Sequence, residues 1–248
     1  MSNDNAGSER IRRLPRIVWC GYRDWSTKIL TRIRSAGCAE IAEVCHTPQA
    51  LDAVMELDPE VNVLVLAGWS WRVPTKIVEQ YACIGLHPSD LPNYRGGSPL
   101  QHQIIDGLTE SRCSLFRLNA DYDTGPMLAQ APMSFKGMIS EVLDELVRAG
   151  SELLIQALQD WPHWEMQCQE LSKGFVRARR KPEASRLDRN DFLQKPLREL
   201  YNFIRALGDP YPNAFLEDDA GNRLLFKNVA FLERALDNVN EGNKENKA

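Results

Sequence analysis

The sequence lacks any long hydrophobic run. A membrane-spanning helix needs roughly 18 or more consecutive apolar residues, and no stretch of this 248-residue chain approaches that length. Residues 1–13 are polar and end in a basic cluster, without the apolar middle and small-residue cleavage site of a secretory signal peptide. We therefore predict a cytoplasmic protein that does not enter a membrane, with a flexible tail over residues 1–14.

Cysteine pairs at metal-binding spacing are also absent. The 6 cysteines include no CxxC pair, and several of them lie in apolar, strand-like runs. This pattern is typical of reduced core thiols. A zinc site and a disulfide framework are both disfavoured, and we expect no metal.

The motifs of several common enzyme classes are missing. The chain has no Walker loop, no HExxH and no GxSxG. The first predicted strand is followed by Gly21 alone rather than by GxGxxG, which disfavours a dinucleotide cofactor.

The chain has no excess of positive charge. Its 30 Lys and Arg residues stand against 34 Asp and Glu residues, which gives a formal net charge of −4. Such a balance creates no global field that attracts nucleic acid, although it leaves room for a local basic patch. Nucleic acid is therefore disfavoured as a partner.

Apolar strand-like runs and segments of helical spacing alternate over the first 90 residues. The predicted strands cover residues 16–20, 40–45, 61–67 and 82–86, and the predicted helices cover residues 24–36, 48–57 and 74–81. The third strand is almost wholly apolar, as expected for a strand buried on both faces of a parallel sheet. The alternation predicts an α/β fold with a Rossmann-like open sheet.

The pattern changes after residue 110. Two strands are predicted over residues 113–118 and 126–133, then a long helix over 139–159, a polar basic linker or substrate-facing loop over 175–189, a helix over 194–207 and a hairpin of 214–217 with 224–232. We expect a catalytic domain over residues 15–160, a small C-terminal α+β extension over 161–238, and a disordered tail over 239–248.

Residues 84–99 carry the strongest functional signal. They begin at the carboxyl end of a buried strand, which is where open α/β sheets bind their ligands. His87 stands at the exit of this strand, before a loop rich in proline and glycine. A lone histidine is more often structural, but this position favours a reactive group.

Asp123 is the second candidate. The segment Asp121-Tyr-Asp-Thr-Gly125 by itself indicates only a turn, because Asp and Gly favour turns for conformational reasons. Together with His87, however, Asp123 completes a potential imidazole–carboxylate pair. A carboxylate beside an imidazole fixes its tautomer and makes it a better proton shuttle.

These segments resemble a known family, the folate-dependent formyltransferases. Residues 87–99 are similar to the family signature, with His-Pro-Ser, a Leu-Pro, then Arg-Gly and Pro at set distances. The turn at 121–125, with Ala129-Gln130 after it, resembles the family's Asp-x-Gly motif. The resemblance covers roughly residues 15–160. More loosely, Arg180-Lys-Pro and the segment 204–215 resemble members that act on nucleotide-linked amino sugars.

The resemblance implies a formyltransferase-type fold and mechanism. The co-substrate would be N10-formyltetrahydrofolate, and the acceptor a neutral primary amine. By likeness, His87 manages the proton and stabilises the tetrahedral intermediate, while Asp123 orients or charges the imidazole. The donor-contacting stretches of the family match Ser89, Asp90, Leu91, Pro92, Arg95, Asn119 and Asp121. Residues 69–74 fall where relatives line the folate pocket, although packing of a sheet end explains their tryptophans equally well.

One departure from the family pattern concerns the oxyanion. Relatives place an asparagine two residues before the histidine, and here that position is Gly85. Losing one oxyanion donor costs about 2.7–4 kcal/mol of transition-state stabilisation. Either another group replaces it (a backbone N–H, an ordered water or a nearby side chain), or the enzyme is slow, or catalysis is lost. The candidate side chains are Gln101, His102, Gln103 and Asn119.

The predicted acceptor is a small molecule, a primary amine on a nucleotide-linked amino sugar. Three alternatives remain open: methionyl-tRNA, an amino acid-derived amine, and a non-catalytic homologue that binds folate or a nucleotide sugar. The last is motivated by Gly85. A homodimer is also left open.

Overall fold

The computed structural model describes residues 13–58 and 60–234. The predicted tails fall outside these ranges, apart from Arg13 and Leu14, and so do residues 235–238 of the predicted C-terminal extension. Within the described ranges, no helix is both long enough and apolar enough to cross a membrane.

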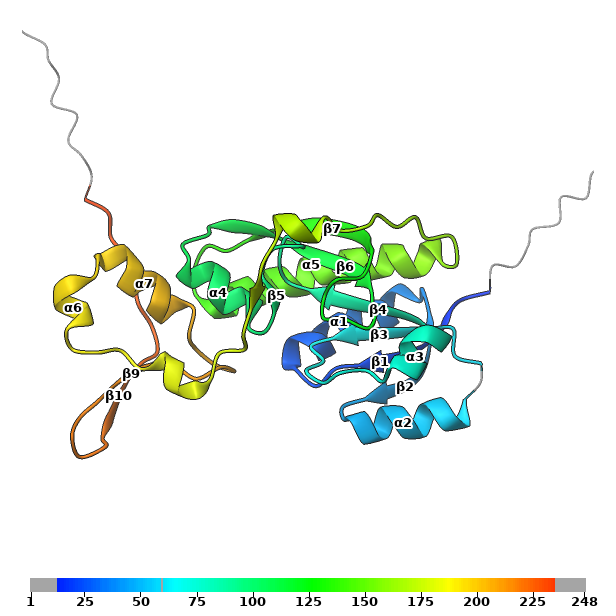
Figure 1. Cartoon of the computed structure of the whole chain (residues 1–248), viewed down its shortest axis with the longest axis horizontal. Helices are drawn as coiled ribbons and strands as arrows, with labels where there is room; N and C mark the ends of the chain where they lie inside the picture. Colours follow the sequence, from blue (N-terminus) through cyan, green and yellow to red (C-terminus); the bar gives the residue numbers. More distant parts are fainter. Residues whose placement is uncertain (1–12, 59, 235–248) are drawn as a thin grey trace, which may run out of the picture.

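The centre of the molecule is a six-stranded sheet in the order β2-β1-β3-β4-β6-β7 (Figure 1). Its strands are β1 Arg16–Cys20, β2 Glu40–Cys45, β3 Val63–Ala67, β4 Ala82–His87, β6 Glu110–Arg117 and β7 Met127–Ser134. The first four run parallel, and β6 and β7 add antiparallel to β4. The predicted α/β open sheet is therefore confirmed.

Helices cover both faces of this sheet. They are α1 Asp24–Ala36, α2 Pro48–Leu57, α3 Thr75–Gln80, α4 Pro99–Ile105 and α5 Ile139–Asp160. Alternate residues of each central strand face opposite sides: Ile17 and Trp19 join the core beneath α1 and α5, whereas Val18 and Cys20 join the core beneath α2 and α3. This two-sided burial explains why β3 is apolar throughout.

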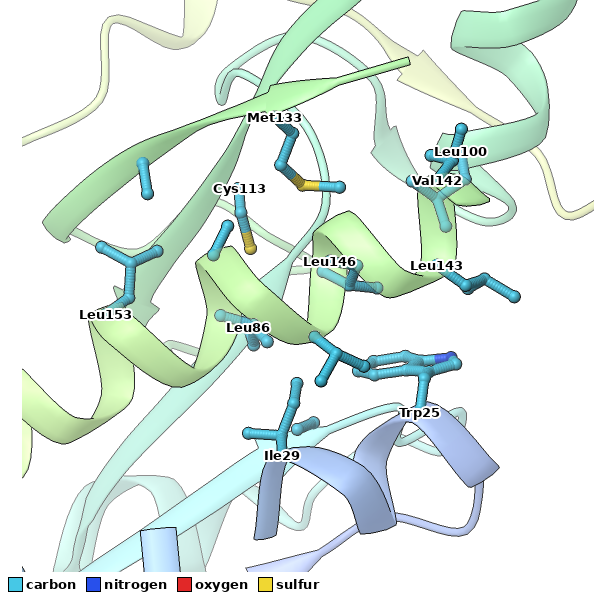
Figure 2. Close-up of a cluster of buried hydrophobic side chains, with 14 of the residues drawn as sticks. Trp25, Ile29, Leu86, Leu100, Cys113, Met133, Val142, Leu143, Leu146 and Leu153 are labelled. Carbon is cyan, nitrogen blue, oxygen red and sulfur yellow. The ribbon is translucent and has the colours of Figure 1, made fainter. Parts of the chain in front are cut away.

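The longest helix, α5, supplies much of the larger core. Its Val142, Leu146 and Leu153 belong to the same buried cluster as Ile29 of α1 and Leu86 of β4 (Figure 2). Apolar residues at helical spacing produce one continuous buried stripe, and packing of that stripe anchors β4 from behind. Because β4 is fixed in this way, the residues at its carboxyl end have a rigid mount.

The C-terminal region packs onto the same core. It contains short 3₁₀ turns at Leu171–Lys173 and Pro182–Ser185, β8 Val176–Arg177, α6 Asp191–Gln194, α7 Leu197–Arg205, and the hairpin of β9 Ala214–Glu217 with β10 Arg223–Phe226. Leu200 and Ile204 of α7 belong to the cluster that α5 dominates. The predicted helix and hairpin are present, although the second hairpin strand ends at Phe226 rather than at residue 232.

Several short elements were not predicted. Helix α4 follows the proline- and glycine-rich loop, and β5 Arg95–Gly96 lies inside that loop. Strand β5 pairs in parallel with β8, which lies in the segment predicted as a linker. This short pairing draws residues 169–182, which we term the strap, across the carboxyl end of β4.

Candidate functional site

His87 is the last residue of β4 and is almost wholly buried, with 6% of its surface exposed. Its Nε2 lies 2.9 Å from the backbone oxygen of Tyr94, in the loop that follows the strand. Because a carbonyl oxygen only accepts hydrogen bonds, Nε2 must carry a proton and donate it. The ring therefore exchanges its other proton at Nδ1.

The carboxylate of Asp123 faces that second nitrogen. Asp123 Oδ2 lies 3.6 Å from His87 Nδ1 and accepts a 2.8 Å hydrogen bond from the backbone N–H of Gly96. This distance is longer than a hydrogen bond, so Nδ1 remains available to another partner. The two residues paired by the sequence analysis thus lie together at the edge of the sheet.

The turn that carries Asp123 is tightly specified. Asp123 adopts a φ of 54°, a left-handed conformation that Asp tolerates better than most residues. A side chain at Gly125 would place its Cβ 1.8 Å from the backbone oxygen of Arg117. Gln169 of the strap donates from Nε2 to the backbone oxygens of Asp123 and Gly125, at 3.1 and 2.7 Å.

Two cavities meet at His87. The first, of about 490 Å³, lies beside the Asp123 turn and is bounded by residues 69–73, 116–123 and the end of β4; we term it the turn cavity. The second, of about 340 Å³, lies between α1, α4, the strap and residues 210–212, and we term it the basic cavity. Seven residues line both: Gly68, Trp69, Ser70, Leu86, His87, Gly96 and Arg179.

The basic cavity takes its name from four cationic side chains. Arg23, Arg179, Arg180 and Lys181 line it, and its lining among the described residues includes no carboxylate. Burial lowers the pKa of Arg180, and the Arg180 Nε has no hydrogen-bond partner. Such a set of cations fits an anionic ligand, with arginine suited to phosphate or carboxylate.

Asn119 and Asp121, both predicted to contact the donor, line the turn cavity. The Asn119 Oδ1 accepts hydrogen bonds from the backbone N–H of Asp121 and from the hydroxyl of Thr124, at 3.2 and 2.9 Å. Residues 69–73, matched by resemblance to the folate pocket, line the same cavity.

The other predicted donor-binding residues lie elsewhere. Ser89, Asp90, Leu91, Pro92 and Arg95 line neither cavity. Ser89 is buried and donates to the backbone oxygen of Asn93, at 2.7 Å, while Asp90 accepts from Gln130, at 2.9 Å. Leu91 is buried, and Arg95 is buried with its Nη2 3.4 Å from the backbone oxygen of Leu171. These residues brace the loop that presents Tyr94 and Gly96.

The sequence analysis left residues 175–189 as a linker or a substrate-facing loop and did not predict that the strap packs against the loop after β4. A Cβ at Gly97 would lie 2.4 Å from Arg179 Cα, so the strap backbone rests directly on the loop after β4. Arg177 donates to Asp106, at 2.8 Å, and His102 Nε2 donates to the backbone oxygen of Ala178, at 3.0 Å. The glycine pair 96–97 was the one signal in the sequence for this close approach.

A metal centre finds no support in the described part of the chain, where no group of three or more His, Cys, Asp or Glu side chains could hold an ion.

Comparison with known proteins shows what this chain is similar to. A family model described as formyl transferase matches residues 38–158. A curated methionyl-tRNA formyltransferase of Chlamydia pneumoniae is 29% identical over 194 residues, which cover 76% of this chain and 60% of the relative. The chain thus spans about 60% of that relative's length.

Solved structures share the fold. A methionyl-tRNA formyltransferase from Clostridium thermocellum superposes with a TM-score of 0.77 at 26% identity, covering 88% of this chain and 94% of that one. A sugar N-formyltransferase from Shewanella has a TM-score of 0.72 at 16% identity, covering 89% and 99%. HypX from Aquifex aeolicus in complex with tetrahydrofolic acid has a TM-score of 0.73 at 18% identity, covering 87% and 38%.

The matched family model spans the strand and the turn that bring His87 and Asp123 together. The curated relative and the solved structure with 26% identity are both named as formyltransferases. Residues 38–158 thus match the formyl transferase family, and the chain is similar over most of its length to formyltransferases.

Proposed function

We propose that this protein transfers a formyl group from N10-formyltetrahydrofolate to a primary amine. The observation that carries the proposal is the position of the His87–Asp123 pair between two cavities. A group transfer between two substrates needs one pocket for each, with the proton-handling residue where they meet.

The chemistry follows from the geometry of the imidazole. The lone pair of the amine attacks the formyl carbon, and the carbonyl electrons move onto oxygen to form a tetrahedral intermediate. His87 Nδ1 takes a proton from the attacking nitrogen and delivers it to N10 of the folate as the C–N10 bond breaks. Asp123, 3.6 Å from Nδ1, stabilises the imidazolium between these two steps.

The turn cavity suits the folate donor. Its volume of about 490 Å³ lies in the range typical of small-molecule sites. Trp69, Trp71, Phe116 and Leu118 provide flat apolar walls, and Asn119 supplies polar contacts at one side. The binding of tetrahydrofolic acid by a structural neighbour with the same fold supports this assignment.

The basic cavity suits an anionic acceptor. We assign to it the amino group of a nucleotide-linked amino sugar, whose diphosphate would lie against Arg23, Arg180 and Lys181. Sugar N-formyltransferases among the structural neighbours support this choice. A reaction that uses a folate co-substrate and such an acceptor fits a cytoplasmic protein.

Methionyl-tRNA is the second candidate acceptor. It is favoured by the names of the curated relatives and of the solved structure with 26% identity. The phosphodiester at the end of a tRNA presents the same sign of charge to the basic cavity, so both acceptors are compatible with this cavity.

One assay tests the proposal. Purified protein is incubated with N10-formyltetrahydrofolate and a panel of nucleotide-linked amino sugars, hydroxylated amino acid amines and methionyl-tRNA, and products are identified by mass spectrometry. We expect a formylated sugar. His87→Ala and Asp123→Asn should each lower kcat/KM about 10²–10⁴-fold. Asparagine at 123 keeps an acceptor for the Gly96 N–H and tolerates a positive φ, so the turn stays intact.

Two outcomes would count against it. If no acceptor in the panel is formylated by wild-type protein that binds folate, the chain is a binding homologue. Formylation of methionyl-tRNA alone would move the assignment to the second candidate. Circular dichroism of both variants serves as the control for folding.

A further inference from the structure

The space beside Gly85 is filled by apolar side chains. Gly85 pairs with Phe116 across β4 and β6, and a Cβ at position 85 would lie 2.9 Å from both Phe116 Cε1 and Leu118 Cδ1. The strand therefore offers no side-chain donor where the family pattern places an amide. The developing oxyanion needs a donor from another element.

Several nearby N–H groups already have partners. Gln103 Nε2 donates to the backbone oxygens of Pro88 and Pro99, at 2.8 and 3.0 Å. His102 Nε2 donates to Ala178 in the strap. Recruiting either group would cost the existing hydrogen bonds of a packed loop.

The location of the formyl carbon narrows the choice further. The donor places the formyl carbon at the turn cavity, and the amine approaches it from the basic cavity. A group that polarises the formyl C=O must therefore line both cavities. Besides His87, the shared lining contains two side chains with N–H donors, Trp69 and Arg179. The Trp69 Nε1 is buried out of contact with solvent, whereas Arg179 is exposed to the cavities.

We propose that Arg179 donates hydrogen bonds to the formyl oxygen and stabilises the oxyanion of the tetrahedral intermediate, in place of the amide that Gly85 lacks. The inference rests on the proposed function. As the amine attacks, the C=O electrons move onto oxygen beside the guanidinium. When the C–N10 bond breaks, those electrons re-form the carbonyl, so Arg179 needs to exchange no proton.

The structure holds Arg179 in a position suited to this task. Its backbone rests on Gly97, and Nη1 and Nη2 each lie 3.1 Å from the Ser70 hydroxyl. The Ser70 hydroxyl is itself 2.6 Å from Tyr22 OH. A guanidinium has five N–H donors, so two hydrogen bonds to Ser70 fix its orientation and leave others for an oxyanion.

The test compares Arg179→Met and Arg179→Lys with wild type, using N10-formyltetrahydrofolate as the donor. The acceptor is a thymidine-diphosphate-linked amino sugar or methionyl-tRNA, whichever the wild type formylates. Arg179→Met should lower kcat about 10²–10³-fold, with KM for both substrates within about threefold of wild type. Arg179→Lys should lie between. Millimolar guanidinium should restore part of the activity of Arg179→Ala but not of His87→Ala. Arg189→Met, an exposed arginine in the turn before α6, is the matched control and should behave as wild type.

Three results would overturn the assignment. An unchanged kcat in Arg179→Met shows that another group holds the oxyanion. A raised acceptor KM at constant kcat shows that Arg179 only binds the anionic end of the acceptor. In both cases the wild type is active, so the proposed function survives. Absence of turnover by the wild type overturns the proposed function and this assignment with it.

Discussion

At the scale of single residues, hydrogen bonds within the chain determine which atoms of the site remain free to contact a substrate. The backbone oxygen of Tyr94 fixes the proton on His87 Nε2, and the N–H of Gly96 fixes the carboxylate of Asp123. Both partners belong to the loop after β4, so the strand and its loop together set the orientation of the pair. Ser89 and Arg95 are buried within or beside this loop and line neither cavity.

Position 85 provides a prediction at this scale. Gly85→Asn alone should lower the free energy of unfolding by about 1–3 kcal/mol, because Phe116 and Leu118 must move to admit the new side chain. The double variant Gly85→Asn/Phe116→Ala should relieve the overpacking. The same two substitutions added to Arg179→Met should raise kcat above that of Arg179→Met alone. Denaturant melts of wild type, Gly85→Asn and the double variant check the stabilities, and kinetics of Arg179→Met with and without the two added substitutions check the rate. Full stability of Gly85→Asn would show that the space is not filled as described.

At the scale of elements, the short pairing of β5 with β8 builds the site. It brings Gln169 to the Asp123 turn and Arg179 to the junction of the cavities. The strap has little core of its own, since Phe175 and Val176 are largely exposed. Its position therefore depends on backbone contacts with Gly96 and Gly97, together with hydrogen bonds such as that of Arg177 to Asp106.

Gly97→Ala should displace the strap. A Cβ at this position would lie within 2.4–2.6 Å of three Arg179 atoms, two of them backbone atoms that cannot rotate away. We expect kcat/KM to fall at least about tenfold, with faster hydrogen exchange over residues 174–181 and a small change in Tm. Gly221→Ala is the control, because it adds backbone strain in the distant hairpin, where nothing lies within 4 Å of the new Cβ. Equal exchange rates in both variants would contradict the proposed role of the strap.

The elements that the sequence predicted well are those with strong periodicity or continuous apolar character. β3 and α5 are examples, because burial on both faces or along one stripe leaves a local pattern. The strap and α4 left no such pattern: their positions are set by backbone packing against glycines 96 and 97 and by contacts between residues roughly 75 apart, such as Arg95 with Leu171. For the same reason the motif pointed to His87 and Asp123 but could not separate Asn119, which lines a cavity, from Ser89, which does not.

At the scale of the whole molecule, the C-terminal region shares the main core. Arg205 of α7 is buried and donates from Nη1 to the backbone oxygens of Phe135 and Gly137, at 2.6 and 3.0 Å. Its Nε donates to Asn202, at 2.9 Å. Burial lowers the pKa of this guanidinium, and its hydrogen bonds join α7 to the segment before α5.

Arg205→Met should lower the free energy of unfolding by about 2–4 kcal/mol, since it leaves buried carbonyl groups without a donor. Because the core is continuous, we expect one cooperative transition in both proteins, with far-ultraviolet circular dichroism and tryptophan fluorescence coinciding. Arg198→Met, on the exposed side of the same helix, should change stability by less than about 0.5 kcal/mol. Two separate transitions would show that the C-terminal region is an independent domain.

The wall shared by the two cavities has a consequence for the order of events. His87 and Arg179 line both the turn cavity and the basic cavity. A ligand in one cavity would therefore contact side chains that the ligand in the other cavity also contacts. Under the proposed function, the formyl group would pass directly from donor to acceptor while both are bound, without a covalent intermediate on the protein. We therefore expect that filling one cavity changes the affinity of the other cavity for its ligand, because the two ligands would share contacts with His87 and Arg179.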